Sequence, residues 1–177
     1  MVATTTADEI LDLFEKTLLN FKNDNKWAAA RFGNIKVISN TLVGDVGQQF
    51  MENLCEQLGV AYSFPQRSDG TREKRGPWDI SIKGKKYELK TATEDVNGNF
   101  QFNHIRYHRQ YDGLICLGVS PDKIRFGIWS AADVKTSKAG KLVSMEKGAN
   151  ASYKLTKKAT ELQGIEHFYQ TIETFRC

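Results

Sequence analysis

Residues 77–90 read PWDISIKGKKYELK, and this stretch decides the fold that the sequence predicts. The runs 78–82 and 86–92 are short, contain apolar and aromatic residues, and lie on either side of Gly84. Short runs of this kind around a glycine are typical of two strands joined by a tight turn. The sequence therefore predicts a β-hairpin here, and the flanking elements are assigned outward from it.

Three charged side chains of this hairpin are expected to meet. Glu88 and Lys90 are two positions apart, so they share one face of their strand, and the turn brings Asp79 beside them. Two converging carboxylates repel each other unless a cation lies between them. Mg²⁺, with Mn²⁺ as a substitute, prefers carboxylate oxygens and keeps some of its waters. Asp79 and Glu88 are thus the expected metal ligands, and Lys90 could orient an attacking water or balance charge on a phosphate.

A simpler interpretation of the same residues stays open. Asp79 and Glu88 could be exposed hairpin residues that pair with the neighbouring lysines Lys83, Lys85 or Lys86. A Glu-x-Lys triplet is common, and by itself it predicts nothing about chemistry. The catalytic interpretation gains its weight from the spacing to Asp79 and from the elements around the hairpin.

Hydrophobic periodicity predicts further helices and strands on both sides of the hairpin. Helices are expected at 7–21, 43–58, 100–110 and 166–175, and strands at 60–64, 114–119 and 124–130. With no repeat or linker in its 177 residues, the chain is expected to form one α/β domain (1–177). Its predicted core has the order α-β-β-β-α-β, with a central mixed sheet flanked by helices.

The helix predicted at 43–58 carries one apolar stripe. Val46, Phe50, Leu54 and Leu58 fall at helical spacing, and the glycine at position 59 provides a stop. This stripe is expected to face the core.

Pro77, Asp79, Glu88 and Lys90, in this order of elements, resemble the PD-(D/E)xK nuclease superfamily, which has the restriction-endonuclease-like fold. The resemblance covers about residues 42–130, and the sequence departs from the motif by inserting a tryptophan between Pro77 and Asp79. It implies a Mg²⁺-dependent endonuclease that cuts double-stranded DNA. Small members are often type II restriction enzymes that act as homodimers, with one active site for each strand.

The resemblance also implies a supporting acidic residue on the first core helix. Glu52 is the choice here for a metal or water contact, although a solvated helix face would explain it equally well. A repair or junction-resolving nuclease of the same fold remains an alternative. So do a DNA-binding module with a dead site and a structural protein with a fortuitous Glu-x-Lys.

The charge distribution fits a polyanionic partner. The chain carries +4 overall, and residues 65–90 and 135–158 are both rich in Lys and Arg. Two solvated loops would be the alternative explanation. The side chains expected to bind DNA are Arg67, Arg72, Lys74, Arg75, Asn103, Arg106, Arg109 and Lys154.

Other features limit the classes of protein that fit. Three widely spaced cysteines form no C-x-x-C pair, so neither a disulfide framework nor a zinc knuckle is expected, and Cys55 and Cys116 are interpreted as core thiols. His104 and His108 lack a third zinc ligand. No signal peptide or membrane-length apolar run is evident, which favours a cytoplasmic protein without membrane contact.

Overall fold

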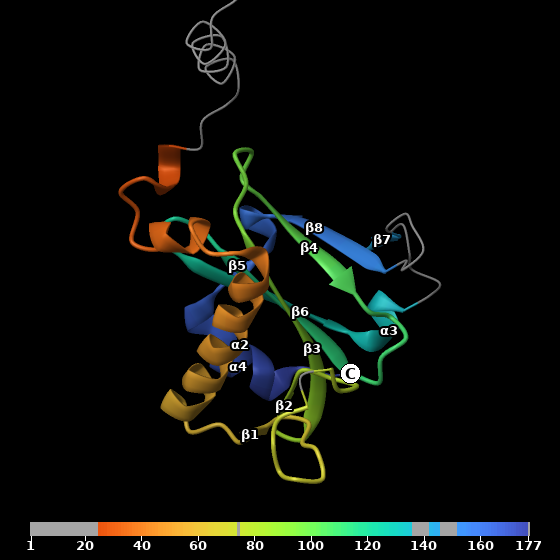
Figure 1. The fold of residues 1–177 in the computed structure, drawn as a ribbon. Coiled ribbons are helices and arrows are strands. Elements are labelled where there is room, and N and C mark those ends of the chain that lie inside the picture. Colours follow the sequence, from red (N-terminus) through yellow and green to blue (C-terminus); the bar gives the residue numbers. More distant parts are fainter. Residues whose placement is uncertain (1–24, 74, 136–141, 146–151, 177) are drawn as a thin grey trace, which may run out of the picture.

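The computed structural model describes residues 25–73, 75–135, 142–145 and 152–176 (Figure 1). The helix predicted at 7–21 lies outside the described residues, as does Lys74. No helix within the described ranges has the length and apolarity needed to cross a membrane.

A six-stranded mixed sheet forms the centre of the molecule. Its strands are β1 (Tyr62–Ser63), β2 (Ile80–Ile82), β3 (Lys85–Thr93), β5 (Gly113–Val119), β6 (Ile124–Ser130) and β9 (Gln163–Gly164), in the order β1-β2-β3-β5-β6-β9. β3 and β5 pair in parallel and the other neighbours pair antiparallel. The predicted hairpin and the central mixed sheet of an α/β fold are therefore confirmed.

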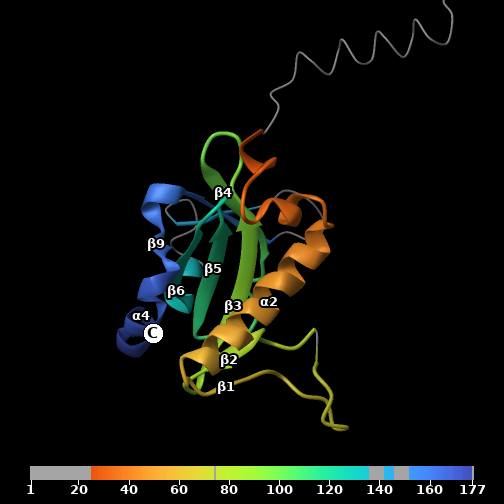
Figure 2. The same cartoon turned by 90° about the vertical axis from the view of Figure 1, so that its left-hand side faces the viewer.

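The helix α2 (Asn40–Gln57) covers one face of this sheet (Figure 2). It begins where the Ser39 hydroxyl accepts a hydrogen bond from Leu42 N, and it ends before Gly59, whose φ of 64° suits glycine. Its approach to β3 is close, because a Cβ on Gly47 would lie 1.8 Å from Thr91 Oγ1. The residue type at position 47 thus sets how near the helix lies to the strand that carries Glu88 and Lys90.

The buried face of α2 differs from the predicted stripe. The side most deeply covered is formed by Val43, Gly47, Met51 and Cys55. The stripe that begins at Val46 lies at the border of the core, where its other members are only partly buried. The prediction placed the apolar face about one position away from the face that packs on β3.

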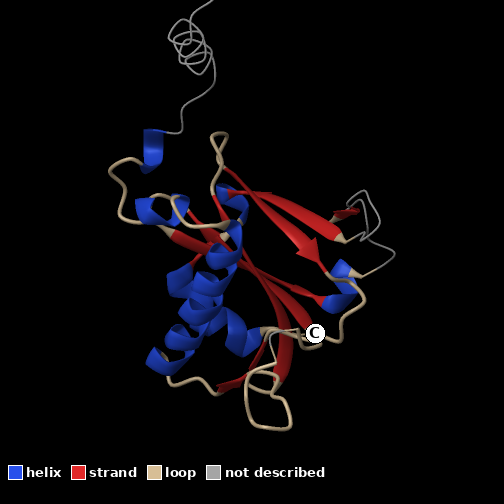
Figure 3. Cartoon of the chain, viewed as in Figure 1, coloured by secondary structure: helices blue, strands red, loops and turns tan. Residues whose placement is uncertain are grey.

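A second, three-stranded sheet lies on the opposite face, in the order β4 (Asn99–Ile105), β8 (Tyr153–Lys158), β7 (Ser144–Met145) (Figure 3). The prediction of a helix at 100–110 was therefore wrong, and the α-β-β-β-α-β order has a strand where the second helix was expected. Phe100 and Phe102 alternate with exposed residues, as in a strand. An irregularity between Phe102 and Ile105 then turns Ile105 inward as well, which mimics helical spacing.

Short elements complete the described fold. They are the 3₁₀ turns η1 (Asn25–Trp27), η2 (Gly33–Lys36), η4 (Ala159–Glu161) and η5 (Ile165–His167), and the helices α3 (Ala131–Val134) and α4 (Phe168–Thr174). The helix predicted at 166–175 corresponds to η5 and α4. Phe168 and Ile172 of α4 join the core on the α2 side of the sheet.

The central sheet separates two apolar clusters. One contains Met51 and Cys55 of α2 with Ile115 of β5, and the other contains Phe102 of β4 with Cys116 of β5. Adjacent residues of β5 thus point into different clusters, as the pleat requires. Cys55 and Cys116 are buried, which confirms their assignment as core thiols.

Candidate functional site

Beyond Tyr87, β3 has no strand of the described chain hydrogen-bonded to the edge that β2 occupies, because β2 begins at Ile80, the partner of Tyr87. Asp79, just before β2, lies at this point. β2 pairs with β3 only over residues 85–87. Just before β2, Asp79 N donates to Tyr87 O at 2.9 Å, and Leu89 N donates to Asp79 Oδ2 at 2.9 Å. The carboxylate therefore takes the place of the next strand residue and is held beside β3.

Glu88 and Lys90 lie on the same face of β3, as the sequence predicts. Glu88 is fully buried, and its Oε1 lies 2.7 Å from Lys90 Nζ. This ion pair is not aligned as a hydrogen bond, so within the described residues Glu88 Oε1 accepts none. Glu88 Oε1 therefore meets the Lys90 ammonium without a directed hydrogen bond, and a carboxylate oxygen has a second lone pair for a further donor or cation.

One arginine binds both carboxylates. Nη1 of Arg109, which follows β4, lies 2.9 Å from Asp79 Oδ1 and 2.7 Å from Glu88 Oε2. Burial alone disfavours the charged guanidinium, but the Glu88 and Asp79 carboxylates outweigh it and raise the pKa of Arg109 above its ordinary value. The two carboxylate oxygens therefore converge on a single cationic nitrogen.

Residues around Arg109 hold its backbone in place. Lys135 Nζ donates to Arg109 O at 2.7 Å and lies 4.6 Å from the centre of the Tyr111 ring. Burial, reinforced by the charge of Glu88, raises the pKa of Tyr111, so this phenol stays neutral. The site is thus supported from the α3 side by contacts that are independent of the carboxylates.

The cluster opens into a pocket of about 710 Å³ between α2 and the β3 edge. Asp79, Lys90 and Arg109 line it, and so does Glu52 of α2. Glu52 Oε1 accepts from Gln48 Nε2 at 2.8 Å and pairs with an arginine of the 65–77 loop. The structure therefore places Glu52 in the same pocket. Its carboxylate is bound by Gln48 and an arginine, however, and does not join Asp79 and Glu88 in binding Arg109.

Within the part of the chain that the structure describes, no group of three or more His, Cys, Asp or Glu side chains is placed to hold a metal ion. The converging carboxylates are two. Mg²⁺ is commonly held by one or two carboxylates, with water and substrate phosphate completing its shell. Two carboxylates are sufficient for that kind of site and insufficient for a closed protein cage.

The arginines of the 65–77 loop differ in whether their side chains form ion pairs with carboxylates. Arg67 Nε lies 3.2 Å from Glu73 Oε2. Arg72 pairs with Glu52 and lies 4.4 Å from the centre of the Phe64 ring. Arg75 is exposed and lines a second hollow beside the site. Of these predicted DNA-binding side chains, Arg75 is the one without a carboxylate partner among the described residues.

The remaining predicted DNA-binding residues lie on or after the small sheet. Asn103 is exposed on β4, where its Oδ1 accepts from Gln101 Nε2 at 3.1 Å. Arg106 is exposed and lines the same pocket as Asp79, whereas Lys154 lies on β8. Arg109 is buried and bound to both carboxylates, but it also lines this pocket, so its contact with DNA stays a prediction.

The role of Arg109 as partner of both acids is the feature that sequence reasoning missed. Its partners are 21 and 30 positions away in the chain. Spacing rules for helices and strands reach only a few residues, so no local pattern connects these side chains. The pairing depends on where β4 and the turn after it lie.

No protein-family model matches this chain, and no curated protein matches it. Among solved structures, it is similar to a bacterial homing endonuclease, I-Ssp6803I, with a TM-score of 0.44 and 17% sequence identity. The match covers 68% of this chain and 75% of that chain. A likeness of this size does not bear on what the chain does, so any function has to be inferred from the site itself.

Proposed function

We propose that the chain is a divalent-metal-dependent endonuclease that hydrolyses phosphodiester bonds of double-stranded DNA. One observation carries the proposal: oxygens of Asp79 and Glu88 lie 2.9 and 2.7 Å from the same nitrogen. Two carboxylates held this way are organised around a cation. Lys90, 2.7 Å from the other oxygen of Glu88, adds the positively charged group that phosphoryl transfer uses.

The residues fit Mg²⁺ or Mn²⁺. Asp79 and Glu88 would hold the ion, and the buried Glu88 Oε1, which accepts no hydrogen bond from the described residues, offers a further oxygen. When bound, such an ion lowers the pKa of a bound water and polarises a phosphoryl oxygen. Arg109 neutralises the carboxylates without metal, so its guanidinium must turn away before an ion can bind them.

The protein side chains then have separate tasks. The Lys90 ammonium can donate hydrogen bonds to the attacking water or to a phosphate oxygen, because it lies on the pocket wall beside Glu88. Arg106 is exposed and lines this pocket, and Arg75 is exposed in the hollow beside it, so both can bind the phosphates that flank the cut. Once displaced, the Arg109 guanidinium is a further donor for a phosphate within the same pocket.

A type II restriction enzyme that acts as a homodimer is our first choice of biological role. The described chain has a single Asp79-Glu88-Lys90 cluster, and one such site hydrolyses one strand at a time. A two-fold dimer matches the pseudo-two-fold symmetry of a duplex. Sedimentation with a cognate duplex would test this: one chain per site, with nicked plasmid accumulating before linear product, contradicts the dimer.

The direct test of the nuclease proposal is plasmid cleavage with Mg²⁺, beside an EDTA control. Asp79→Asn and Glu88→Gln should abolish cleavage while DNA binding survives or improves, because repulsion of the phosphates falls. Glu161→Gln, which changes an exposed carboxylate paired with Lys157, is the matched control and should cleave normally. Full activity in Asp79→Asn would refute the site.

The pattern of products separates the possible roles. Discrete fragments indicate a restriction enzyme, random degradation a nonspecific nuclease, and preferential cutting of branched DNA a junction-resolving enzyme. Mg²⁺-dependent binding without any cleavage would contradict the endonuclease and favour a DNA-binding module with a dead site.

A further inference from the structure

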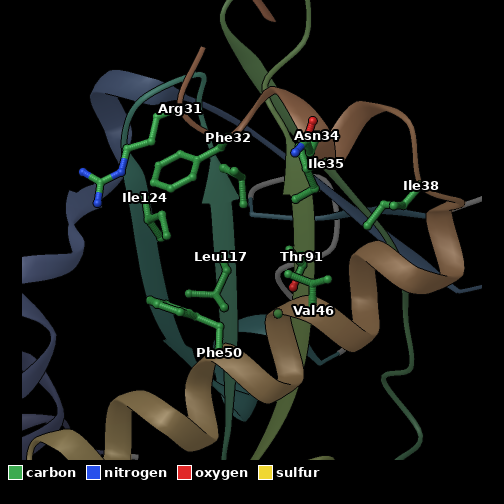
Figure 4. Close-up of a pocket in the computed structure, with 12 residues that line it drawn as sticks. Arg31, Phe32, Asn34, Ile35, Ile38, Val46, Phe50, Thr91, Leu117 and Ile124 are labelled. Carbon is green, nitrogen blue, oxygen red and sulfur yellow. The ribbon is translucent and has the colours of Figure 1, made fainter. Parts of the chain in front are cut away.

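An apolar groove of about 410 Å³ lies on the α2 face of the central sheet, in a different place from the pocket beside Asp79. Figure 4 shows Val46 and Phe50 of α2 on one side of it, Phe32 and Ile35 of the 31–38 segment on another, and Leu117 of β5 at its floor. Its wall is almost entirely hydrocarbon. A polar or charged ligand would find few partners here.

The groove leaves apolar side chains in contact with solvent. Val46 is 47% exposed, and Leu42, one helical turn earlier on the same face of α2, is 49% exposed. This is the part of the helix where the sequence predicts a core-facing stripe. The stripe and the groove together indicate that something apolar covers this face.

The first 24 residues of the chain have the composition to cover it. Apolar residues recur at alternating intervals of four and three, a pattern formed by Ala7, Leu11, Phe14, Leu18 and Phe21. This spacing predicts a helix of 15 residues, about 22 Å long, with one apolar stripe. An isolated helix of that length is only marginally stable in water, so it needs a surface to pack on.

The place where this segment joins the described fold favours the groove of the same chain. Residues 22–24 span at most about 10 Å, and only residues 25–30 separate them from the 31–38 wall of the groove. A short tether gives an effective concentration in the millimolar range. Packing within one chain is therefore favoured over packing against a second copy.

Charge is complementary as well. Residues 1–24 hold five acidic and two basic side chains. Beside the groove, Arg31 and Lys36 are exposed, and neither side chain forms an ion pair among the described residues, although Lys36 Nζ donates to Thr93 Oγ1. The acidic face of a docked helix would supply partners for both.

We propose that residues 7–21 form an amphipathic helix that packs its apolar stripe into this groove of its own chain, between α2 and the 31–38 segment. The groove is then an internal docking surface, and the proposal is independent of whether the chain is a nuclease.

Hydrogen–deuterium exchange on the full chain tests it, with Val46→Asp as the perturbation. Val96→Asp is the matched control, because Val96 is also 47% exposed but lies in the turn between β3 and β4. In the wild type and in Val96→Asp, amides 7–21 should exchange roughly tenfold or more slowly than unstructured chain. In Val46→Asp this protection should be lost, while β5 stays protected.

Phe14→Asp perturbs the other side of the same contact and leaves the described core untouched. It should also expose amides 7–21, and the double variant Phe14→Asp/Val46→Asp should lose no more stability than the more damaging single change. Unprotected amides 7–21 in the wild type, or protection that survives Val46→Asp, overturns the proposal. Protection that disappears on dilution together with a dimer assigns the groove to a second copy and overturns it equally.

Discussion

Replacing Arg109 by methionine should destabilise the metal-free protein and make its stability depend strongly on Mg²⁺. The Arg109 side chain is 8% exposed and neutralises Glu88, which is fully buried, and Asp79, which is 21% exposed. Removing one partner of a buried ion pair typically lowers the free energy of unfolding by 3–5 kcal/mol. Glu88 keeps Lys90 and Asp79 keeps the Leu89 N–H, so we expect about 3 kcal/mol, at the lower end of that range.

The assay is thermal unfolding in EDTA and again with Mg²⁺. For a chain of this size, about 3 kcal/mol corresponds to a fall in Tm of roughly 6–12 °C in EDTA. Mg²⁺ at a hundred times its Kd adds about 2.7 kcal/mol to the folded state, which should restore most of the loss in Arg109→Met. The wild type should gain less, because there the ion has to displace a guanidinium bound to both carboxylates.

Arg106→Met is the matched control. Arg106 lines the same pocket but is exposed and forms no ion pair among the described residues, so its replacement should change stability by no more than about 0.5 kcal/mol. The reasoning is refuted if Arg109→Met melts like Arg106→Met in EDTA. Equal shifts by Mg²⁺ in Arg109→Met and the wild type would show that Arg109 does not compete with the ion.

Three further predictions follow from the same structure. Lys90→Met should slow cleavage by about 10²-fold or more, with partial rescue in Lys90→Arg, since a positioned proton-transfer or charge-stabilising group contributes at least that much; a near wild-type rate would make Lys90 a structural lysine. DNA affinity should fall steeply with salt, and Arg75→Ala and Arg106→Ala should each reduce the slope of log affinity against log salt by about one; an unchanged slope would exclude phosphate contacts there. Burial, with a smaller contribution from Glu52, raises the pKa of Cys55 to about 11, so the folded state holds this proton more tightly than the unfolded state, whose thiol pKa is about 8.5. Stability should therefore be lost as the pH rises from about 8.5 to about 11, and urea unfolding at pH 8 and pH 10 should show a smaller loss in Cys55→Ala than in the wild type.

The hairpin cluster could be predicted because everything that defines it is local. Asp79, Glu88 and Lys90 lie within 12 consecutive positions, and the period of a strand fixes which side chains share a face. The tight turn at Gly84, where φ is 80°, then fixes the pairing of the two strands. Sequence and structure agree here because one short-range rule determines each step.

The strand β4 could not be predicted by the same means. Its buried side chains are Phe100, Phe102 and Ile105, and the interval of three that follows the interval of two comes from an irregularity in the pairing with β8. At this irregularity His104 adopts a φ of 55°, which no periodicity rule anticipates for a non-glycine residue. The error mattered for the site, because it placed Arg109 on a helix face when it follows a strand.

Counting the charged residues of each sequence segment also overestimated how much positive charge the surface offers to a partner. Residues 65–90 hold four more basic than acidic residues, yet several of those cations are already paired with carboxylates in the structure. Arg67 pairs with Glu73, and Lys83 pairs with Glu173 of α4. Pairs of this kind form within the loop or across the fold, so the count of charges in a segment does not measure the charge available to a partner.

Two exposed arginines without an ion pair among the described residues lie next to the carboxylate cluster. Arg75 and Arg106 line one hollow, and Arg106 also lines the pocket that contains Asp79 and Lys90. A phosphate bound by Arg106 would therefore lie beside the acidic pair, where Arg109 supplies the positive charge in the metal-free state. An incoming phosphate and an incoming metal ion act on Arg109 in the same direction, since one attracts the guanidinium and the other replaces it. Metal binding and DNA binding should accordingly be coupled, each favouring the other, and Arg109 is the residue through which this coupling would act.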